Sequence, residues 1–459
     1  MSDHRENHEP QAPRDHRAEA AILDASDPLA GVRDRFVLDD TVYLDGNSLG
    51  ALPRSVPDKV ADVVARQWGE MRIRSWTEGS WWEAPERIGD RIAPLIGAAP
   101  GRVVVADSTS VNVFKAVIAG VRMAGPGCTE ILVDATTFPT DGYIARSAAR
   151  MTGLAVRPVE PARIADEVTE RTALALVNHV DYRTGRLHDL PGITAALHSA
   201  GALAVWDLCH SAGALPVGLD AHGVDLAVGC TYKYLNGGPG SPAYLYIRES
   251  LQERFESPLP GWNSHVEPFG MASRYEPADG ITRGRVGTPD ILSLLALDAA
   301  LDAWDGVTVE AVRTKSLALS DFFLDCVAAY VPPGEVRSVT PYDHARRGSQ
   351  VSLECAGAGE VMAELIRRGV VGDFREPDVL RFGLTPLYTS FGDVERAARV
   401  LGEVLRERPT EDDAGAGGSG EAGGPAGPGP AAGSGPAAGP GDSGPAAGAD
   451  GPAPDDPAA

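Results

Sequence analysis

The sequence has few cysteines and no long apolar run, and both absences narrow the class of protein. Its five cysteines form no CxxC pair, so neither a disulfide framework nor a zinc knuckle is expected, and reduced thiols in a cytosol fit best. The first twenty residues lack the apolar stretch of a secretory signal. The sequence also contains no run of about twenty apolar residues, which is the length that spans a membrane. We therefore expect a soluble, cytoplasmic protein without a metal site.

Basic residues are in the minority, with 41 Lys and Arg against 64 Asp and Glu. The formal net charge is −23, and setting aside the eight acids from Glu411 onward leaves −15 on the rest. An acidic surface repels phosphate backbones, so nucleic-acid binding is not expected. Residues 409–459 contain no aromatic or large aliphatic side chain and predict a disordered acidic Gly/Ala/Pro tail.

Between a predicted disordered arm (residues 1–20) and this tail, short apolar runs alternate with amphipathic segments. They predict buried strands at 103–107, 130–134, 173–180 and 202–207, and crossover helices at 110–121, 141–151 and 193–201. Such alternation is typical of an α/β fold with a mostly parallel, seven-stranded type of sheet and helices on both faces. We expect a large domain over residues 21–305 and a smaller C-terminal α+β domain over 306–408.

Residues that can bind a cofactor follow the first two apolar runs, where the loops of an open α/β sheet converge. The hydroxyl residues 108–110 precede a predicted helix, and this position favours an anion such as phosphate, although N-capping alone also explains them. Phe138, in the turn Phe138-Pro139-Thr140-Asp141, offers a flat face to a planar ring or is an aromatic buried under the turn.

Two charged residues at the ends of later runs indicate pyridoxal phosphate chemistry. Asp207 ends a buried strand, and facing a pyridinium nitrogen it would keep the ring protonated as an electron sink. Lys233, between Tyr232 and Tyr234, is poorly solvated, which favours Schiff-base formation; an exposed lysine at a strand end is the alternative. His210 is either a neighbour of the ring or a loop histidine.

Arg381 lies inside an apolar strand of the predicted C-terminal domain. Its planar guanidinium suits either a substrate carboxylate or a structural ion pair. The order along the chain is a hydroxyl anion site, a stacking residue, an acid, a lysine and a distal arginine. This order is expected of a fold-type I pyridoxal-phosphate enzyme, the transferase-like class of these enzymes.

From about Val42 to Leu401 the sequence resembles kynureninase. The resemblance is carried by YLDGNSLGALP, IRSW, DSTSVNVFKA, FPTD, DYRTG, WDLCHSAGALPV, YKYLNGGPG, GTPDILSL and DFREPDVLRFGLTPLYTSF. It implies pyridoxal 5'-phosphate-dependent hydrolytic Cβ–Cγ cleavage of L-kynurenine or 3-hydroxy-L-kynurenine. The products would be an anthranilate and L-alanine, in tryptophan catabolism or NAD biosynthesis. It also implies a homodimer whose site is shared between subunits.

The resemblance assigns a role to each matching residue. Lys233 would hold the cofactor, Tyr232 would contact its phosphate, and Asp207 would hold the ring nitrogen. From the chemistry of the reaction we further expect Lys233 to move the substrate α-proton, and as a hypothesis Tyr232 relays a proton to or from the hydrated ketone. The cofactor would be bound by Thr109, Ser110, Phe138, Pro139, Thr140, Asp141, Asp207, His210, Tyr232, Lys233 and, from the neighbouring subunit, Trp262 and Thr288. The substrate would be bound by Arg381, Trp76, Ser264 and His265.

Three residues depart from the pattern of the family. Thr77 and Asp181 stand where Asn is usual, and Ser264 stands where Gly is expected. Because Ser264 would lie near the aryl group of the substrate, a biosynthetic relative that acts on a ring-substituted kynurenine is an alternative.

Two further alternatives concern the class of protein. A fold-type I enzyme such as a cysteine desulfurase needs a reactive cysteine on a mobile loop, whereas Cys355 lies in a strand-like segment. A non-catalytic scaffold with the same fold is disfavoured because Lys233, Asp207 and Arg381 are retained together.

Overall fold

The structure of the chain is a computed structural model that describes residues 14–408. The predictions for residues 1–13 and for the tail at 409–459 lie outside this range. Within it, no helix is both long and apolar enough to cross a membrane.

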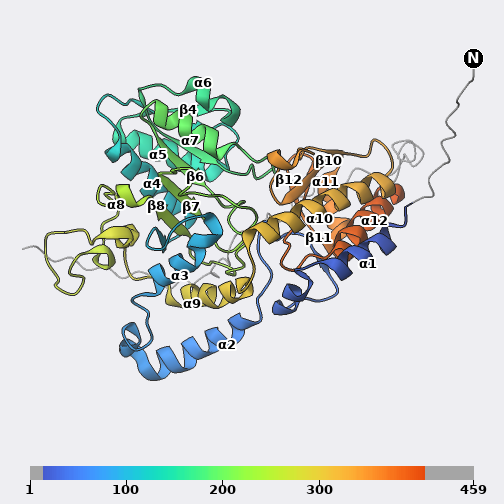
Figure 1. Cartoon of the computed structure of the whole chain (residues 1–459), viewed down its shortest axis with the longest axis horizontal. Helices are drawn as coiled ribbons and strands as arrows, with labels where there is room; N and C mark the ends of the chain where they lie inside the picture. Colours follow the sequence, from blue (N-terminus) through green and yellow to red (C-terminus); the bar gives the residue numbers. More distant parts are fainter. Residues whose placement is uncertain (1–13, 409–459) are drawn as a thin grey trace, which may run out of the picture. The chain divides into compact units, whose positions relative to one another are not determined.

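The central sheet has seven strands in the order β2-β8-β7-β6-β5-β3-β4. Its strands β4, β6, β7 and β8 are labelled in Figure 1, with helices around them. The strands are β2 (Val103–Val105), β3 (Glu130–Asp134), β4 (Ala155–Val159), β5 (Thr172–Asn178), β6 (Leu203–Asp207), β7 (Leu226–Gly229) and β8 (Tyr244–Ile247). Strand β8 runs antiparallel to both of its neighbours, and all the other pairs are parallel. The predicted mostly parallel sheet is confirmed.

Both faces of this sheet are buried, because alternate residues of each strand point to opposite sides. In β5, Ala175 and Val177 belong to one apolar core, and Leu174 and Leu176 belong to another. The helices of this part of the chain are α3 (Ala84–Ile92), α4 (Thr109–Met123), α5 (Pro139–Thr152), α6 (Ile164–Glu167), α7 (Leu190–Ser199), α8 (Glu249–Gln252) and α9 (Ile291–Ala300).

A second, four-stranded antiparallel sheet has the order β12-β13-β10-β9. Its strands are β9 (Val336–Ser338), β10 (Gln350–Cys355), β12 (Asp373–Arg375) and β13 (Val379–Gly383). The helices near it are α10 (Val309–Tyr330), α11 (Ala358–Arg367) and α12 (Phe391–Glu407) (Figure 1). The short strands β1 (Val42–Tyr43) and β11 (Val370–Val371) pair in parallel.

The start of the chain contributes to the core of this C-terminal part. Ala20, Val42 and Leu44 pack in the same apolar cluster as Leu353 and Phe382 of β10 and β13. A division of the chain at residues 305/306 therefore leaves out an N-terminal segment that packs with residues 306–408. This long-range contact could not be predicted from local patterns, because the pairing of β1 with β11 depends on the folded backbone.

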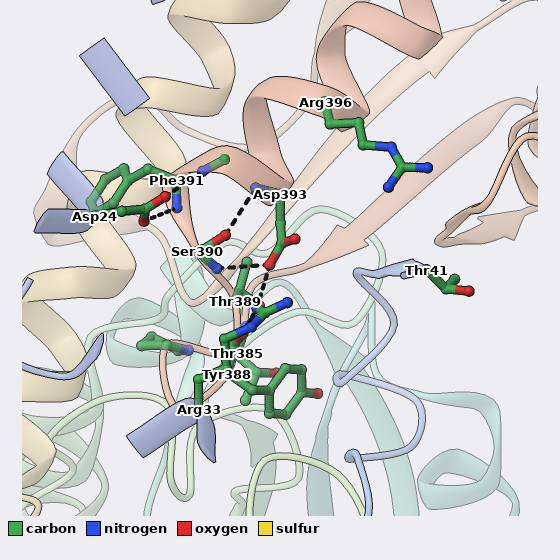
Figure 2. Close-up of polar contacts among 12 residues, drawn as sticks. Asp24, Arg33, Thr41, Thr385, Tyr388, Thr389, Ser390, Phe391, Asp393 and Arg396 are labelled. Atoms are coloured by element: carbon green, nitrogen blue, oxygen red, sulfur yellow. Dashed lines mark hydrogen bonds and ion pairs between the residues drawn. The ribbon is translucent and has the colours of Figure 1, made fainter. Parts of the chain in front are cut away.

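The predicted disordered arm at residues 1–20 overlaps a helix, so the prediction is wrong for its last five residues. Helix α1 (His16–Ser26) begins inside the arm, and Ala20 is buried. Asp24 of α1 accepts the N–H groups of Phe391 and Gly392, at 2.7 and 3.0 Å, and so caps the start of α12 (Figure 2). The polar composition of this segment hid a helix that is stabilised by tertiary contacts rather than by its own apolar face.

The segment between β1 and β2 is largely helical, in keeping with the helical spacing of Val60, Val63, Val64 and Trp68. Helix α2 (Ser55–Asp62) continues as a π-helical segment, Val63–Met71, and then as a 3-10 helix, Arg72–Trp76. Trp68 is 60% exposed, so one of the residues that produced the apolar spacing faces outward.

Candidate active site

Lys233 lies in the turn between β7 and β8. Its Nζ is 3.0 Å from Nε2 of His210, which lies in the turn after β6. The loop before α2 covers this turn, since the N–H of Gly50 donates to the carbonyl of Tyr232 at 2.8 Å. A Cβ at Gly50 would lie 2.4 Å from the carbonyl oxygen of Lys233, so only glycine fits there. The turn that holds Lys233 is thus fixed from both sides.

The chain has four lysines, and Lys233 differs from two of the other three, Lys115 and Lys315. Lys115 pairs with Asp107, and Lys315 pairs with Asp27, each at 2.7 Å. Within residues 14–408 Lys233 has no carboxylate partner and contacts an imidazole instead. An amine that is not held as the cation of an ion pair is suited to a Schiff base.

Two carboxylates and an amide, which we call the acid cluster, lie at the carboxyl edge of the seven-stranded sheet. Asp207 ends β6, Asn178 ends β5, and Asp141 lies in the first turn of α5. The amide of Asn178 donates to Asp207 at 3.0 Å and to Asp141 at 3.5 Å, and the N–H of Cys209 donates to Asp207 at 2.6 Å.

The two carboxylates of the acid cluster do not share their charge equally. Burial raises the pKa of Asp141 well above its usual range, and the negative charge of Asp207 beside it raises this pKa further. Burial and the neighbouring Asp207 charge therefore both favour the protonated form of Asp141. This charge is what a pyridinium nitrogen would face.

His210 is neutral in this arrangement. Burial lowers its pKa well below the usual value, and the charge of Lys233 lowers it further. Because Nε2 faces the amine of Lys233, the ring proton is assigned to Nδ1. Nδ1 is buried and has no hydrogen-bond partner within the described residues, so this donor is left for a bound group.

A cavity of about 490 Å³ adjoins the N-terminus of α4 and is lined by Ser108, Thr109, Tyr232 and Thr288, among others. The first N–H groups of a helix lack acceptors within the helix, and with hydroxyls beside them they favour a phosphate. The Sγ of Cys209 lies 3.9 Å from Oγ1 of Thr109 and so connects the cavity to the turn after Asp207. A phosphate site, a buried carboxylate and a free lysine together fit pyridoxal phosphate.

The remaining residues predicted for the cofactor lie around this group. Phe138 is 45% exposed, and its ring meets that of Tyr182 edge to face with centroids 5.3 Å apart. Pro139 is exposed and begins α5, and Thr140 is half-buried behind it. Ser110 is exposed and does not line the cavity. Phe138 is therefore open to a planar ligand, while Pro139 and Thr140 shape the turn.

Arg381 lies in β13 and is 1% exposed. It forms an ion pair with Asp373 of β12, which also pairs with Arg375 at 2.7 Å. Its guanidinium donates further to the carbonyl of Tyr182 at 2.7 Å and to the hydroxyl of Ser48 at 2.9 Å. We call Arg381, Arg375, Asp373 and Ser48 the arginine cluster. The ion pair that the sequence left as an alternative is present, and Tyr182 connects this cluster to Phe138.

Trp76, Trp262, Ser264 and His265 are not brought to Lys233. Within the described chain none of the four makes a hydrogen bond or an aromatic contact with Asp207, His210 or Lys233. The rings of Trp76 and Trp262 lie 6.0 Å apart in an aromatic group of their own.

Ser264 is fully buried, and its hydroxyl lies 3.0 Å from that of Tyr275. His265 faces a cavity of about 320 Å³ that Trp262 also lines. Thr288, expected to act in the neighbouring subunit, lines the cavity of its own chain beside Tyr232, because it lies in the loop that leads into α9.

The sequence analysis missed Asn178, Tyr182 and Asp373. Asn178 could have been predicted from the sequence, because it is a polar residue at the end of a buried strand, as Asp207 is. Tyr182 is placed by Asp181, whose carboxylate accepts the N–H groups of the two residues that follow Tyr182 and so fixes the turn. The departure at Asp181 from the usual Asn therefore keeps a turn-forming side chain.

Known proteins resemble this chain over most of its length. The family model described as the kynureninase C-terminal domain matches residues 312–401. A kynureninase from Deinococcus radiodurans is 49% identical over 397 residues, covering 85% of this chain and 96% of the relative. A kynureninase from Burkholderia pseudomallei is 46% identical over 396 residues, covering 85% and 95%.

Solved structures share the fold at much lower identity. The cysteine desulfurase CsdA from Escherichia coli has a TM-score of 0.71 and 19% identity, over 82% of this chain and 98% of its own. A C-DES variant with glycine covalently linked to its pyridoxal phosphate also gives 0.71 and 19%, over 81% and 99%. At this identity the likeness establishes the fold-type I architecture alone.

Proposed function

As a member of the kynureninase family this chain is a pyridoxal-phosphate-dependent hydrolase that cleaves a carbon–carbon bond, and we propose that its substrate is L-kynurenine, 3-hydroxy-L-kynurenine or both. Water is consumed, and the products are the corresponding anthranilate and L-alanine, as in tryptophan catabolism or NAD biosynthesis in the cytoplasm. The observation that carries the proposal is a lysine without a carboxylate partner, 3.0 Å from a neutral imidazole, beside a buried acid cluster.

The residues proposed to hold the cofactor each meet one part of it. When bound, pyridoxal phosphate supplies an electron sink for the bonds at the substrate Cα. Asp207 would face the ring nitrogen and keep it protonated, and Asp141 would border the same part of the cofactor, since the amide of Asn178 donates to both carboxylates. His210, beside Lys233, would contact the cofactor through its unpartnered Nδ1. Thr109, with the N–H groups at Thr109 and Ser110, holds the phosphate. Phe138 stacks on the ring.

Two residues move protons. Lys233 would hold the cofactor and, when its amine is free, would take the substrate α-proton as a general base. The nearby charge of Cys230 and burial raise the pKa of Tyr232, so its hydroxyl is protonated at neutral pH. A protonated phenol can donate to the hydrated ketone of the substrate, and this is the role we assign to Tyr232.

Arg381 is proposed to bind the substrate carboxylate by exchange. In this structure the guanidinium of Arg381 forms an ion pair with Asp373. A substrate carboxylate offers the same planar pair of oxygens and would take one face of this guanidinium, whose Nε has no partner within the described residues. The substrate then lies between Arg381 and the turn of Lys233, with Tyr182 next to both Arg381 and Phe138.

We further propose a homodimer in which Trp262, with Trp76, Ser264 and His265, serves the site of the other subunit. Support comes from their separation from Lys233 in a single chain and from exposed apolar side chains near them, of which Phe269 is 69% and Met271 is 81% exposed. Mixing Lys233→Ala and Trp262→Ala subunits would then restore about a quarter of the activity, because half of the dimers regain one intact site. No recovery after subunit exchange would contradict a shared site.

The cysteine desulfurase alternative finds no support in the C-terminal part. Cys355 ends β10, is 1% exposed and lies among apolar side chains, so it is not placed on a mobile loop.

The reaction itself is tested with purified full-length holoenzyme. Anthranilate fluorescence should appear with L-kynurenine, and a parallel assay with 3-hydroxy-L-kynurenine gives the substrate preference. Lys233→Ala should release neither product, while Lys59→Ala, a substitution on helix α2, should leave the rate unchanged. Absence of product from both substrates in cofactor-loaded wild type would contradict the proposed function.

A further inference from the structure

Two thiols, Cys209 and Cys230, meet beneath the candidate site. They follow the neighbouring parallel strands β6 and β7, in which Asp207 pairs with Val228. Two residues further along each strand, the N–H of Cys230 lies 3.2 Å from Sγ of Cys209, and Sγ of Cys230 lies 3.7 Å from the carbonyl oxygen of Cys209. These contacts fix the two side chains against each other.

The spacing of the two strands suits a disulfide. Neighbouring strands lie about 4.8 Å apart, and a disulfide joins residues whose Cα atoms are roughly 4.4–6.8 Å apart. The other cysteines lack such a neighbour within residues 14–408. Cys128 contacts only backbone carbonyls, and Cys326 and Cys355 are buried in the C-terminal core.

The two thiols also differ in reactivity. Cys209 is half-buried and can be reached, whereas Cys230 is 3% exposed. Burial opposes ionisation of Cys230, but the hydrogen bond with Cys209 and the charge of Lys233 outweigh it and lower the pKa of this thiol. The same hydrogen bond, together with burial, raises the pKa of Cys209 well above its usual value. An accessible thiol beside a more acidic one is the arrangement of an attacked and a resolving cysteine.

We propose that Cys209 and Cys230 form a redox-sensitive pair that a low-molecular-weight disulfide converts into an intramolecular disulfide, which stops turnover. Cys209, the thiol that the reagent can reach, loses its proton and attacks the reagent disulfide, which releases one reagent thiol and leaves a mixed disulfide. The Cys230 thiolate then attacks Sγ of Cys209 and releases the second reagent thiol. The protein loses two electrons and two protons, and the reagent disulfide is reduced to two thiols.

The bond would act on the residues proposed for catalysis through the backbone. The N–H of Cys209 donates to Asp207, and its Sγ lies beside Thr109. Cys230 is followed, after one residue, by Tyr232 and Lys233. Drawing the two sulfurs to bonding distance pulls both turns together, so we expect oxidation to displace Asp207 and Lys233 from their positions.

The test treats full-length holoenzyme with oxidised glutathione and follows both mass and anthranilate formation. No Lys or Arg lies between Arg186 and Lys233, so trypsin yields both cysteines in one peptide, 187–233. We expect this peptide to become lighter by two hydrogens and to resist alkylation. The rate should fall at least tenfold, and dithiothreitol should reverse both changes. The mass readout does not depend on the proposed reaction.

Variants separate this pair from other thiols. Cys209→Ala keeps the N–H that binds Asp207 and should retain its rate during the treatment, whereas Cys128→Ser should be inhibited like wild type. If glutathione stayed attached to Cys209 and Cys230 could still be alkylated, the proposed disulfide between the two cysteines would be contradicted. Formation of the disulfide without loss of activity, or equal inhibition of Cys209→Ala, would overturn its control of turnover.

Discussion

The acid cluster is buried throughout, whereas the arginine cluster is buried at Arg381 and partly exposed elsewhere, and only the arginine cluster contains charges of both signs. Asp141, Asn178 and Asp207 are held by amide and N–H donors, and within residues 14–408 no Lys or Arg pairs with these carboxylates. Arg381 and Arg375, by contrast, both pair with Asp373. A buried charge without a counter-ion is costly unless a ligand supplies one. The acid cluster is therefore built for a bound cation, and the arginine cluster for exchange of one carboxylate for another.

Removing the amine beside the acid cluster should have the largest effect. Lys233→Ala should lower turnover by at least about 10³-fold, since both the cofactor link and the general base are lost. The visible absorbance of lysine-bound cofactor should disappear in the same variant. If Lys233→Ala kept this absorbance, the cofactor would be linked to another lysine, such as Lys115.

Two matched substitutions distinguish the roles of the two carboxylates in the acid cluster. Asp207→Asn removes the negative charge that faces the ring and should lower kcat by roughly 10²–10³-fold. Asp141→Asn replaces an acid that is already protonated, because its pKa is raised by burial and by Asp207, and should cost less than about tenfold. Steady-state kinetics of both variants decide the assignment. Equal losses would contradict an ionised Asp207 beside a neutral Asp141.

Exchange at the arginine cluster predicts a change in KM more than in kcat. Arg381→Lys loses the planar fork and should raise KM by about 10- to 100-fold, in keeping with roughly 1.5–3 kcal/mol for hydrogen bonds to a charged group. Asp373→Asn removes the competing carboxylate and should leave KM unchanged or lower, while it destabilises the fold by about 3 kcal/mol because the buried guanidinium of Arg381 loses its charged partner. A raised KM in Asp373→Asn would contradict exchange.

The smallest expected effect concerns Asp45, which lies near the arginine cluster. Burial raises its pKa from 3.8 to about 6, and the charge of Asp373 contributes. The folded state therefore binds this proton more tightly than the unfolded state, so the contribution to stability is complete below about pH 4 and is lost as pH rises through about 6. Asparagine has no proton to lose in this range, so the Asp45→Asn variant does not lose this contribution to stability as pH rises.

The difference in Tm between Asp45→Asn and wild type should accordingly grow as pH rises from 4 to 7. We expect on the order of one or two degrees, because a change of about 1 kcal/mol shifts Tm only slightly in a large chain. Differential scanning calorimetry of both proteins cancels the contribution of Asp134, whose pKa is also raised to about 6 by burial. A constant difference would contradict the raised pKa.

Much of the fold followed from the sequence because strands buried on both faces appear as short apolar runs. The run at 130–134 coincides with β3, and Asp207 and Lys233 were found because each lies where such a run ends. The environment of Arg381 could not be derived in this way. Asp373 faces it across the antiparallel pair of β12 and β13, so their contact depends on a strand register that neither local pattern contains.

Two other features needed the folded chain. The helix at the start of the described residues is held by Asp24 at the N-terminus of α12, more than 360 residues away in sequence. The contact between Cys209 and Cys230 likewise arises from the pairing of β6 with β7, and the sequence showed only scattered thiols.

The most direct test of the central claim is to locate the cofactor linkage on the protein. Holoenzyme is reduced with sodium borohydride, digested and examined by mass spectrometry for a pyridoxyl-phosphate adduct on each of the four lysines. We predict the adduct on Lys233 alone, because Lys115 and Lys315 are held in ion pairs. An adduct on Lys59, Lys115 or Lys315, or the absence of any adduct, would contradict the assignment of Lys233 as the cofactor lysine.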